Sequence, residues 1–94
     1  MPRYLIERNF GRIDDEKMRG YSVESARILK DDMTGVAWVH SHVAIAPDGT
    51  IRTFCVYVAP DVDHLHEHAD RLGGHEIEAI YEIGGDVAPS DFIA

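Results

Sequence analysis

The chain has 94 residues, the size of one domain with a single modest core, and its hydrophobic content of 45% is that of a globular protein. A formal net charge of −8 without a basic stripe argues against a nucleic-acid partner, and no run approaches the roughly 20 apolar residues of a membrane span. A single cysteine cannot form an internal disulfide, so we expect a soluble protein of the reducing cytoplasm.

The first third of the chain predicts a strand and then a helix. Residues 4–10 are rich in strand formers and are followed by Gly11. Alternation along this strand places three side chains on one side: Tyr4, Ile6 and Arg8. Asp14 and Asp15 favour a helix start, and apolar residues recur at roughly helical spacing as far as Met33.

A hairpin follows, because two apolar-rich runs flank the turn Pro47-Asp48-Gly49. The turn predicts that Ala46 lies opposite Thr50. Counting outward gives the pairs His42 with Phe54, Ser41 with Cys55, and His40 with Val56. One face is then predicted to carry Trp38, His40, His42, Phe54, Val56 and Val58. The opposite face is predicted to carry Val39, Ser41, Val43, Thr53, Cys55 and Tyr57, and a one-residue slip would exchange the two sets.

The last third predicts a second helix and a fourth strand. Asp61 starts the helix and Gly73 stops it. The apolar stripe of this helix consists of Val62, Leu65, Ala69 and Leu72. Residues 76–83 form the strand, with Ile77, Ala79 and Tyr81 expected on one face.

The predicted order is strand, helix, strand, strand, helix, strand. Two crossover helices on one side of a four-stranded antiparallel sheet make a ferredoxin-like α+β fold. Residues 1–83 are predicted to form the single domain and residues 84–94 a C-terminal tail. The uncovered sheet face favours a homodimer, and the tail, with Phe92 and Ile93, either docks on the partner subunit or frays.

Four segments spread over most of the chain read YLIER, AWVHSHV, TFCVYVAPD and EHADRLG. They resemble a family of small ferredoxin-like bacterial proteins of unknown function, one member of which is described as nickel-binding. The resemblance implies the same fold, nickel as the metal, and a role for His68. His42 departs from the family's pattern, in which an aromatic residue, commonly tyrosine, is expected at this position. His64 and His66 are particular to this sequence.

The pair His40 and His42 is the first candidate metal site. The two histidines are two residues apart on a predicted strand, so both imidazoles point to the same side of it. Their backbone positions are roughly 6–7 Å apart. Imidazole suits nickel, zinc and copper, so the two rings could converge on one ion. The alternative is a pair of polar residues on a solvated or interfacial sheet face.

Further candidate ligands lie on the second helix and in the third strand. His64 and His68 are one helical turn apart, which is either a two-point chelate or a solvated helix face. The run HLHEH also matches the H-x-x-E-H pattern of inverted zinc proteases, but so short a chain has no room for their third ligand and cleft. Cys55 is either a buried small hydrophobe or a thiolate ligand or nucleophile beside Tyr57.

Two functions are compatible with these residues. The first is a non-catalytic homodimer that binds nickel or another divalent transition metal through His40, His42 and His68, with Cys55 as a further ligand. The second is a small dimeric α+β-barrel enzyme that uses a pocket histidine as acid–base on an apolar small molecule. The candidate pocket-lining residues are Trp38, Phe54 and Tyr57. A third possibility is a dimer whose histidines have no special role.

Overall fold

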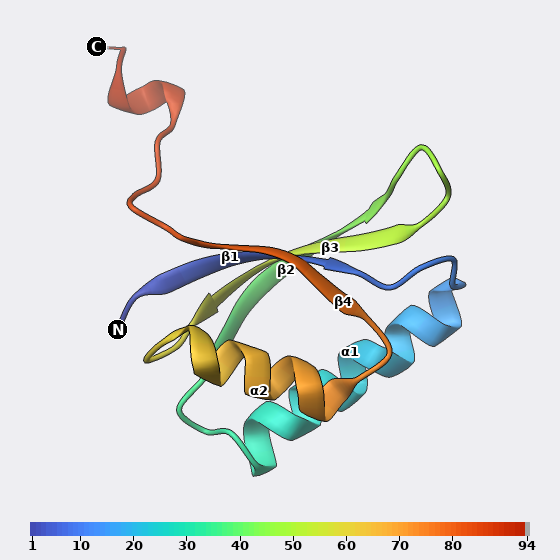
Figure 1. Ribbon diagram of the computed structural model, residues 1–94. Coiled ribbons are helices and arrows are strands. Elements are labelled where there is room, and N and C mark those ends of the chain that lie inside the picture. Colours follow the sequence, from blue (N-terminus) through green and yellow to red (C-terminus); the bar gives the residue numbers. More distant parts are fainter. Residues whose placement is uncertain (94) are drawn as a thin grey trace.

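The computed structural model describes residues 1–93, and Ala94, the end of the predicted tail, lies outside the described residues. The elements are β1 (Arg3–Asn9), α1 (Asp15–Asp31), β2 (Ala37–Ile45), β3 (Ile51–Val58), α2 (Val62–Leu72), β4 (Glu76–Glu82) and the short 3-10 helix η1 (Pro89–Asp91). This order and a four-stranded antiparallel sheet confirm the predicted ferredoxin-like α+β fold (Figure 1). Within residues 1–93, no helix is long and apolar enough to cross a membrane.

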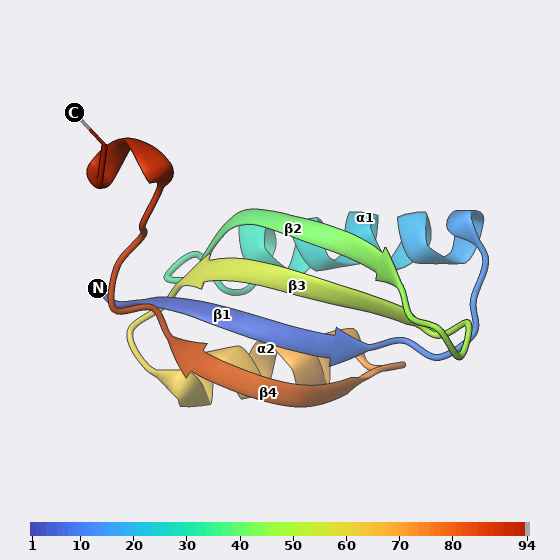
Figure 2. The ribbon, with the colours of Figure 1, turned by 90° about the horizontal axis from the view of Figure 1, so that it is seen from above.

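The sheet has the strand order β2-β3-β1-β4, and every neighbouring pair is antiparallel. Both helices lie on one side of it, with α1 nearer β2 and α2 nearer β4 (Figure 2). The other side of the sheet is called the open face below, and neither α1 nor α2 lies on it. β2 and β4 are the two edge strands.

Local sequence explains where the helices begin and end. The Asp14 side chain accepts a hydrogen bond from the Lys17 backbone N–H at 2.8 Å, which caps α1. Asp61 caps α2 in the same way, accepting from the His64 N–H at 3.0 Å. Gly73 ends α2 with a φ of 67°, a left-handed value that glycine adopts without steric cost.

The predicted turn sets the register of the β2–β3 hairpin. Gly49 has a φ of 84°, and its N–H donates to the Ala46 carbonyl at 2.9 Å. Ala46 in turn donates to the Thr50 carbonyl at 2.9 Å, which closes the hairpin where the sequence places it. The structure confirms the predicted pairs His42 with Phe54, Ser41 with Cys55, and His40 with Val56.

One predicted face assignment in β2 is wrong. The register shifts between Trp38 and His40, so that Val39 is an extra residue and Trp38 pairs with Tyr57. This bulge turns Trp38 away from the strand histidines and towards the helices. There its indole Nε1 donates to Ser41 Oγ at 2.8 Å, and its ring stacks on Tyr57 with the centroids 6.3 Å apart.

A second shift corrects the prediction for β4. Glu7 pairs with Ala79 and Arg8 pairs with Ile77, which leaves Glu78 as the extra residue. Ile77 therefore packs against the core between the sheet and the helices. The prediction that Ile77 shares a face with Ala79 is wrong for this reason.

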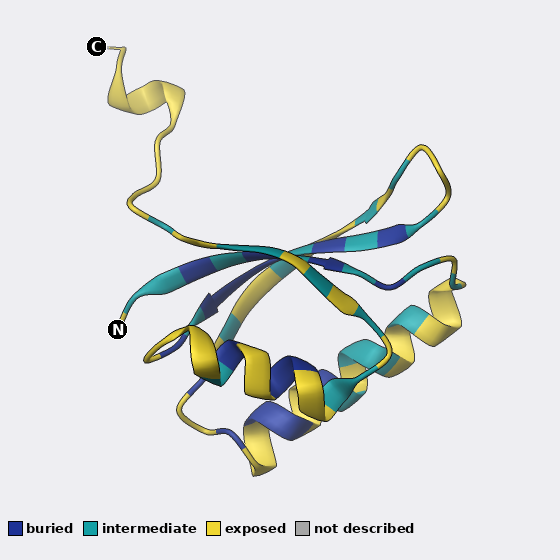
Figure 3. Cartoon of the chain, in the orientation of Figure 1, coloured by how far each residue is buried: buried dark blue, intermediate teal, exposed yellow. Residues whose placement is uncertain are grey.

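The core fills the space between the helices and the covered face of the sheet. Figure 3 shows buried residues on the inner sides of both helices and in β1 and β3, whereas the outer helix faces and residues 84–93 are exposed. The cluster comprises Tyr4, Ile6, Ile28, Leu29, Met33, Val36, Cys55, Tyr57, Ala59 and Leu65. In the tail, Phe92 is 77% and Ile93 70% exposed, so neither contributes to this core.

Candidate functional site

His40 and His42 project from β2 onto the open face, and both side chains are exposed. Their ring centroids are 5.5 Å apart and the rings are nearly perpendicular, at 83°. A metal bound about 2 Å from a ring nitrogen lies roughly 3 Å from the ring centroid, so centroids up to about 6 Å apart can share one ion. The pair therefore has the spacing of a two-point ligand for a transition metal.

Within residues 1–93, no third candidate ligand lies beside this pair. The residues that follow His42 across the open face are Phe54 on β3 and Glu7 on β1. Glu7 is two strands away, roughly 10 Å, and its Oε2 accepts from Arg52 at 2.9 Å. Among residues 1–93, no three His, Cys, Asp or Glu side chains come close enough together to hold a metal ion.

The other two predicted ligands lie on the covered side of the sheet. Cys55 pairs with the core residue Ile6, is 4% exposed, and its Sγ donates to Thr53 Oγ1 at 3.2 Å. His68 projects inward from α2 and is fully buried. Because the sheet separates these two residues from the strand histidines, the four predicted ligands cannot share one ion within one chain.

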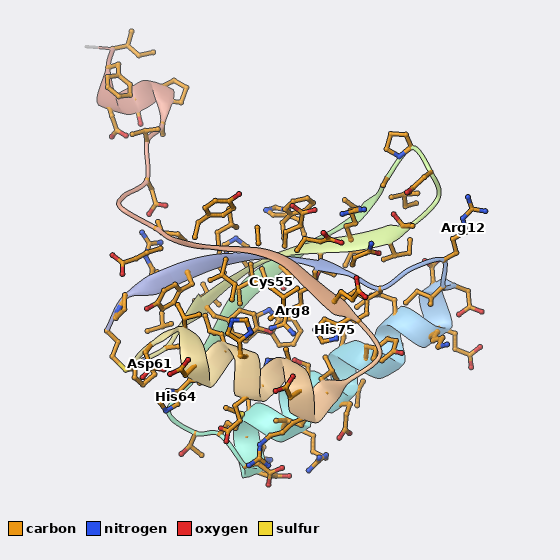
Figure 4. All side chains as sticks on the ribbon, in the orientation of Figure 1. Arg8, Arg12, Cys55, Asp61, His64 and His75 are labelled. Carbon is orange, nitrogen blue, oxygen red and sulfur yellow. The ribbon has the colours of Figure 1, made fainter. Side chains whose placement is uncertain are left out.

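His68 belongs instead to a buried network around Arg8. Arg8 extends from β1 into the space between the sheet and the helices, where its side chain meets His75 (Figure 4). Its guanidinium lies 3.0 Å from His75 Nε2 and 3.2 Å from His68 Nδ1, and His68 Nε2 lies 3.0 Å from Ser25 Oγ. The guanidinium also sits over the Tyr57 ring, with Cζ 5.3 Å from the centroid.

The network fixes which nitrogen of each histidine carries the proton. Arginine can only donate, so His68 Nδ1 and His75 Nε2 must accept. The proton of His68 is therefore on Nε2 and is donated to Ser25 Oγ. The proton of His75 is on Nδ1 and is donated to the Gly73 carbonyl at 2.9 Å.

Burial, followed by the charge of Arg8, lowers the pKa of His68 to about 4. The pKa of His75 is also lowered, chiefly by burial, with Arg8 adding to the effect. Both rings are consequently neutral at neutral pH, and Arg8 carries the one charge of the network. Burial raises the pKa of Tyr57, which is therefore also uncharged.

A cavity of about 120 Å³ adjoins this network, between α1 and the covered face of the sheet. Its walls come from both helices and three strands: Arg8, Phe10, Met18, Tyr21, Ser22, Ser25, Trp38, Ser41, Val43, Thr53, Cys55, Tyr57 and Leu72. Of the three predicted pocket residues, Trp38 and Tyr57 line this cavity, whereas Phe54 lies on the open face beside His42.

The cavity offers little support to the acid–base enzyme. His40 and His42 lie on the other side of the sheet from it. Both ring nitrogens of the buried His68 are engaged, and a pKa of about 4 is far from the neutral range that suits a general base.

The outer histidines of α2 have separate surroundings. His64 Nδ1 lies 2.6 Å from Asp61 Oδ1 at the start of the helix, and this hydrogen bond raises the pKa of His64 (Figure 4). His68 turns inward from the same helix, so the two do not form the predicted chelate. His66 is exposed.

Sequence reasoning missed Arg8, Ser25 and His75 as site residues. One signal was available for Arg8, because alternation places it on the same side of its strand as Tyr4 and Ile6, where an arginine needs buried partners. No signal was available for the partners, since His75 lies 67 positions along the chain from Arg8.

In a comparison with known protein families, residues 4–83 match the family described as "Nickel responsive protein SCO4226-like". The chain belongs to this SCO4226-like family. A similar solved structure is the crystal structure of SCO4226 from Streptomyces coelicolor A3(2), with 19% sequence identity, a TM-score of 0.69, and coverage of 90% of this chain and 99% of that one. A likeness at this identity shows the fold alone. The search of curated proteins found no match.

The family assignment confirms the resemblance seen in the sequence. The range matched to the SCO4226-like family, residues 4–83, contains both the open-face histidines and the buried Arg8 network. The tail from residue 84 onward lies outside it.

Proposed function

We propose that this SCO4226-like protein is a non-catalytic homodimer that binds a divalent transition metal, with nickel as the preferred ion, through His40 and His42. The observation that carries the proposal is the pair of exposed imidazoles with ring centroids 5.5 Å apart. The description of the family as nickel responsive favours nickel over zinc. A formal net charge of −8 attracts cations to the protein and is consistent with this role.

Dimerisation supplies the ligands that one chain lacks. β2 is an edge strand, and three of its apolar side chains are exposed along that edge: Val39 at 53%, Val43 at 58% and Ile45 at 77%. Val43 and Ile45 alternate with the histidines and so lie on the opposite face of the strand. In a two-fold symmetric interface each surface meets its own copy, so an axis near β2 brings up to four imidazoles around one ion. The exposed Phe92 and Ile93 of the tail provide a second contact with the partner subunit. We place the dimer in the cytoplasm, because its lone buried Cys55 suits a reducing compartment.

The test of the metal site is calorimetric titration of tag-free protein with nickel chloride and zinc chloride. We expect His40→Ala and His42→Ala each to weaken nickel binding at least tenfold. His66→Ala is the matched control, because His66 is an exposed histidine on α2, and α2 covers the face of the sheet opposite to His40 and His42. If the two strand variants fold and bind nickel as the parent does, the pair is not the site.

Light scattering at micromolar concentration tests the homodimer, with and without nickel. A monomer in both conditions contradicts the proposed assembly. Removal of residues 92–94 then separates the two contacts, since an unchanged dimer confines the interface to the sheet.

A further inference from the structure

Arg8 is a buried cation without a counter-ion. Its side chain is 2% exposed, and no carboxylate of residues 1–93 lies within ion-pair distance of it. Its two partners, His68 and His75, are neutral, and its Nε–H is buried without any hydrogen-bond acceptor in the described chain. Burying an unpaired charge and an unsatisfied donor is costly, so this arrangement calls for an anionic acceptor.

The cavity that Arg8 lines offers hydrogen-bond donors and no anion. Ser25 Oγ accepts from His68, Ser41 Oγ accepts from Trp38, and Thr53 Oγ1 accepts from Cys55. The hydroxyls of Ser41 and Thr53 donate to no other group of residues 1–93, so each has its proton available for a ligand. The Ser25 hydroxyl faces Tyr57, whose pKa is raised by burial and lowered in part by a hydrogen bond with Ser25, so the Ser25 proton has to turn from Tyr57 to a ligand. No Asp or Glu is among the described residues that line the cavity.

The rest of the wall is apolar and the space is small. Phe10, Met18, Tyr21, Val43 and Leu72 supply much of the surface. The volume of about 120 Å³ is near that of a cavity of roughly 150 Å³ known to hold benzene. The ligand therefore combines a hydrocarbon body of a few carbon atoms with one acceptor group.

We propose that this cavity binds a small monocarboxylate, whose carboxylate is held by Arg8 and by the Ser25 hydroxyl and whose hydrocarbon body lies against the apolar wall. Arginine presents several N–H donors in a plane that suits a carboxylate. A single negative charge balances the single charge of the network, whereas a phosphate dianion would leave buried negative charge uncompensated. The proposed metal pair on the open face takes no part in this site.

The experiment is calorimetric titration of the tag-free, metal-free full chain with sodium butyrate, with butyramide as the neutral analogue of the same size, and with inorganic phosphate. We expect butyrate to bind at least tenfold more tightly than butyramide, because only the carboxylate pairs with the buried cation. Phosphate is expected to bind more weakly than butyrate.

Two serine variants locate the site. Ser25→Ala is expected to weaken butyrate binding by about tenfold or more, the usual effect of losing one hydrogen bond to a charged group. Ser22→Ala is the matched control, because Ser22 lines the same cavity but its hydroxyl already donates to the Met18 carbonyl at 3.1 Å. The affinity of Ser22→Ala for butyrate should stay within twofold of that of the parent.

Arg8→Met is expected to abolish the preference for butyrate over butyramide. If Arg8→Met does not fold, two results still test the carboxylate site. These are the ratio of butyrate to butyramide affinity in the parent and the butyrate affinities of the two serine variants. The proposal is overturned if butyrate fails to bind up to about 10 mM, if butyramide or phosphate binds as well as butyrate, or if Ser25→Ala binds butyrate as the parent does.

Discussion

Acid should destabilise this protein through His68, and the structure sets the size of the effect. His68 is fully buried and neutral, held between Arg8 and Ser25, and its pKa is lowered from 6.5 to about 4. As the pH falls below 6.5, the unfolded chain takes up a proton at this position, whereas the folded chain does so only near pH 4. The contribution of neutral His68 is therefore fully present above pH 6.5 and is lost as the pH falls towards 4.

Each pKa unit corresponds to about 1.36 kcal/mol, so the shift predicts a loss of about 2 kcal/mol in the free energy of unfolding between pH 7 and pH 5. Two other histidines have pKa values shifted by the fold. His75, whose pKa is also lowered, adds to the loss, and His64, whose pKa is raised by Asp61, opposes it. Both remain in a variant at position 68, so the comparison of parent and variant isolates His68.

The assay is urea unfolding at several pH values between 7 and 5, at one protein concentration, for the parent and His68→Gln. Glutamine cannot ionise but can still accept from Arg8 and donate to Ser25. We expect the parent to lose about 2 kcal/mol more than His68→Gln over this range. His66→Gln, on the exposed side of the same helix, should behave as the parent does. Equal pH dependence in parent and His68→Gln would refute the reasoning.

Three further variants test the packing and the local signals. Leu65→Ala should lower the free energy of unfolding by about 2–5 kcal/mol in urea titrations, because Leu65 is fully buried between α2 and the sheet; a loss below 1 kcal/mol would contradict this packing. Asp14→Ala should cost about 1 kcal/mol by the same measurement, since it removes the cap of α1. Gly74→Ala should lower the melting temperature, because the added Cβ would clash with the Tyr21 hydroxyl and the backbone φ is 72°. Gly85→Ala, with open space around it, is its control and should leave the melting temperature unchanged.

The turn Pro47-Asp48-Gly49 shows how far local sequence carries the fold. It defines a hairpin closed by Ala46 and Thr50, and period-two counting from there pairs His42 with Phe54 correctly. Counting fails beyond His40, where the bulge at Val39 reverses the alternation. No glycine marks that position, and a bulge stabilised by tertiary contacts leaves no local signal.

The buried network lies beyond such reasoning for a different reason. Spacing rules find histidines that are neighbours on one element, such as His40 and His42 on a strand. Arg8, Ser25 and His68 come from β1, α1 and α2, and only the packing of both helices on one face of the sheet brings them together. Their charge states follow from burial, which the sequence indicates only through the apolar neighbours of Arg8.

The bulge at Val39 separates the two proposed sites while leaving them on the same strand. It allows Trp38 and Ser41 to face the cavity together, with the indole donating to the serine hydroxyl. His40 and His42 face the opposite side, although His42 is the next residue after Ser41. In a regular strand Trp38 would lie on the histidine face, and Ser41 would lose the donor that leaves its own proton free for a ligand. The metal and the carboxylate can therefore be tested separately, because a side chain that contacts one ligand points away from the other.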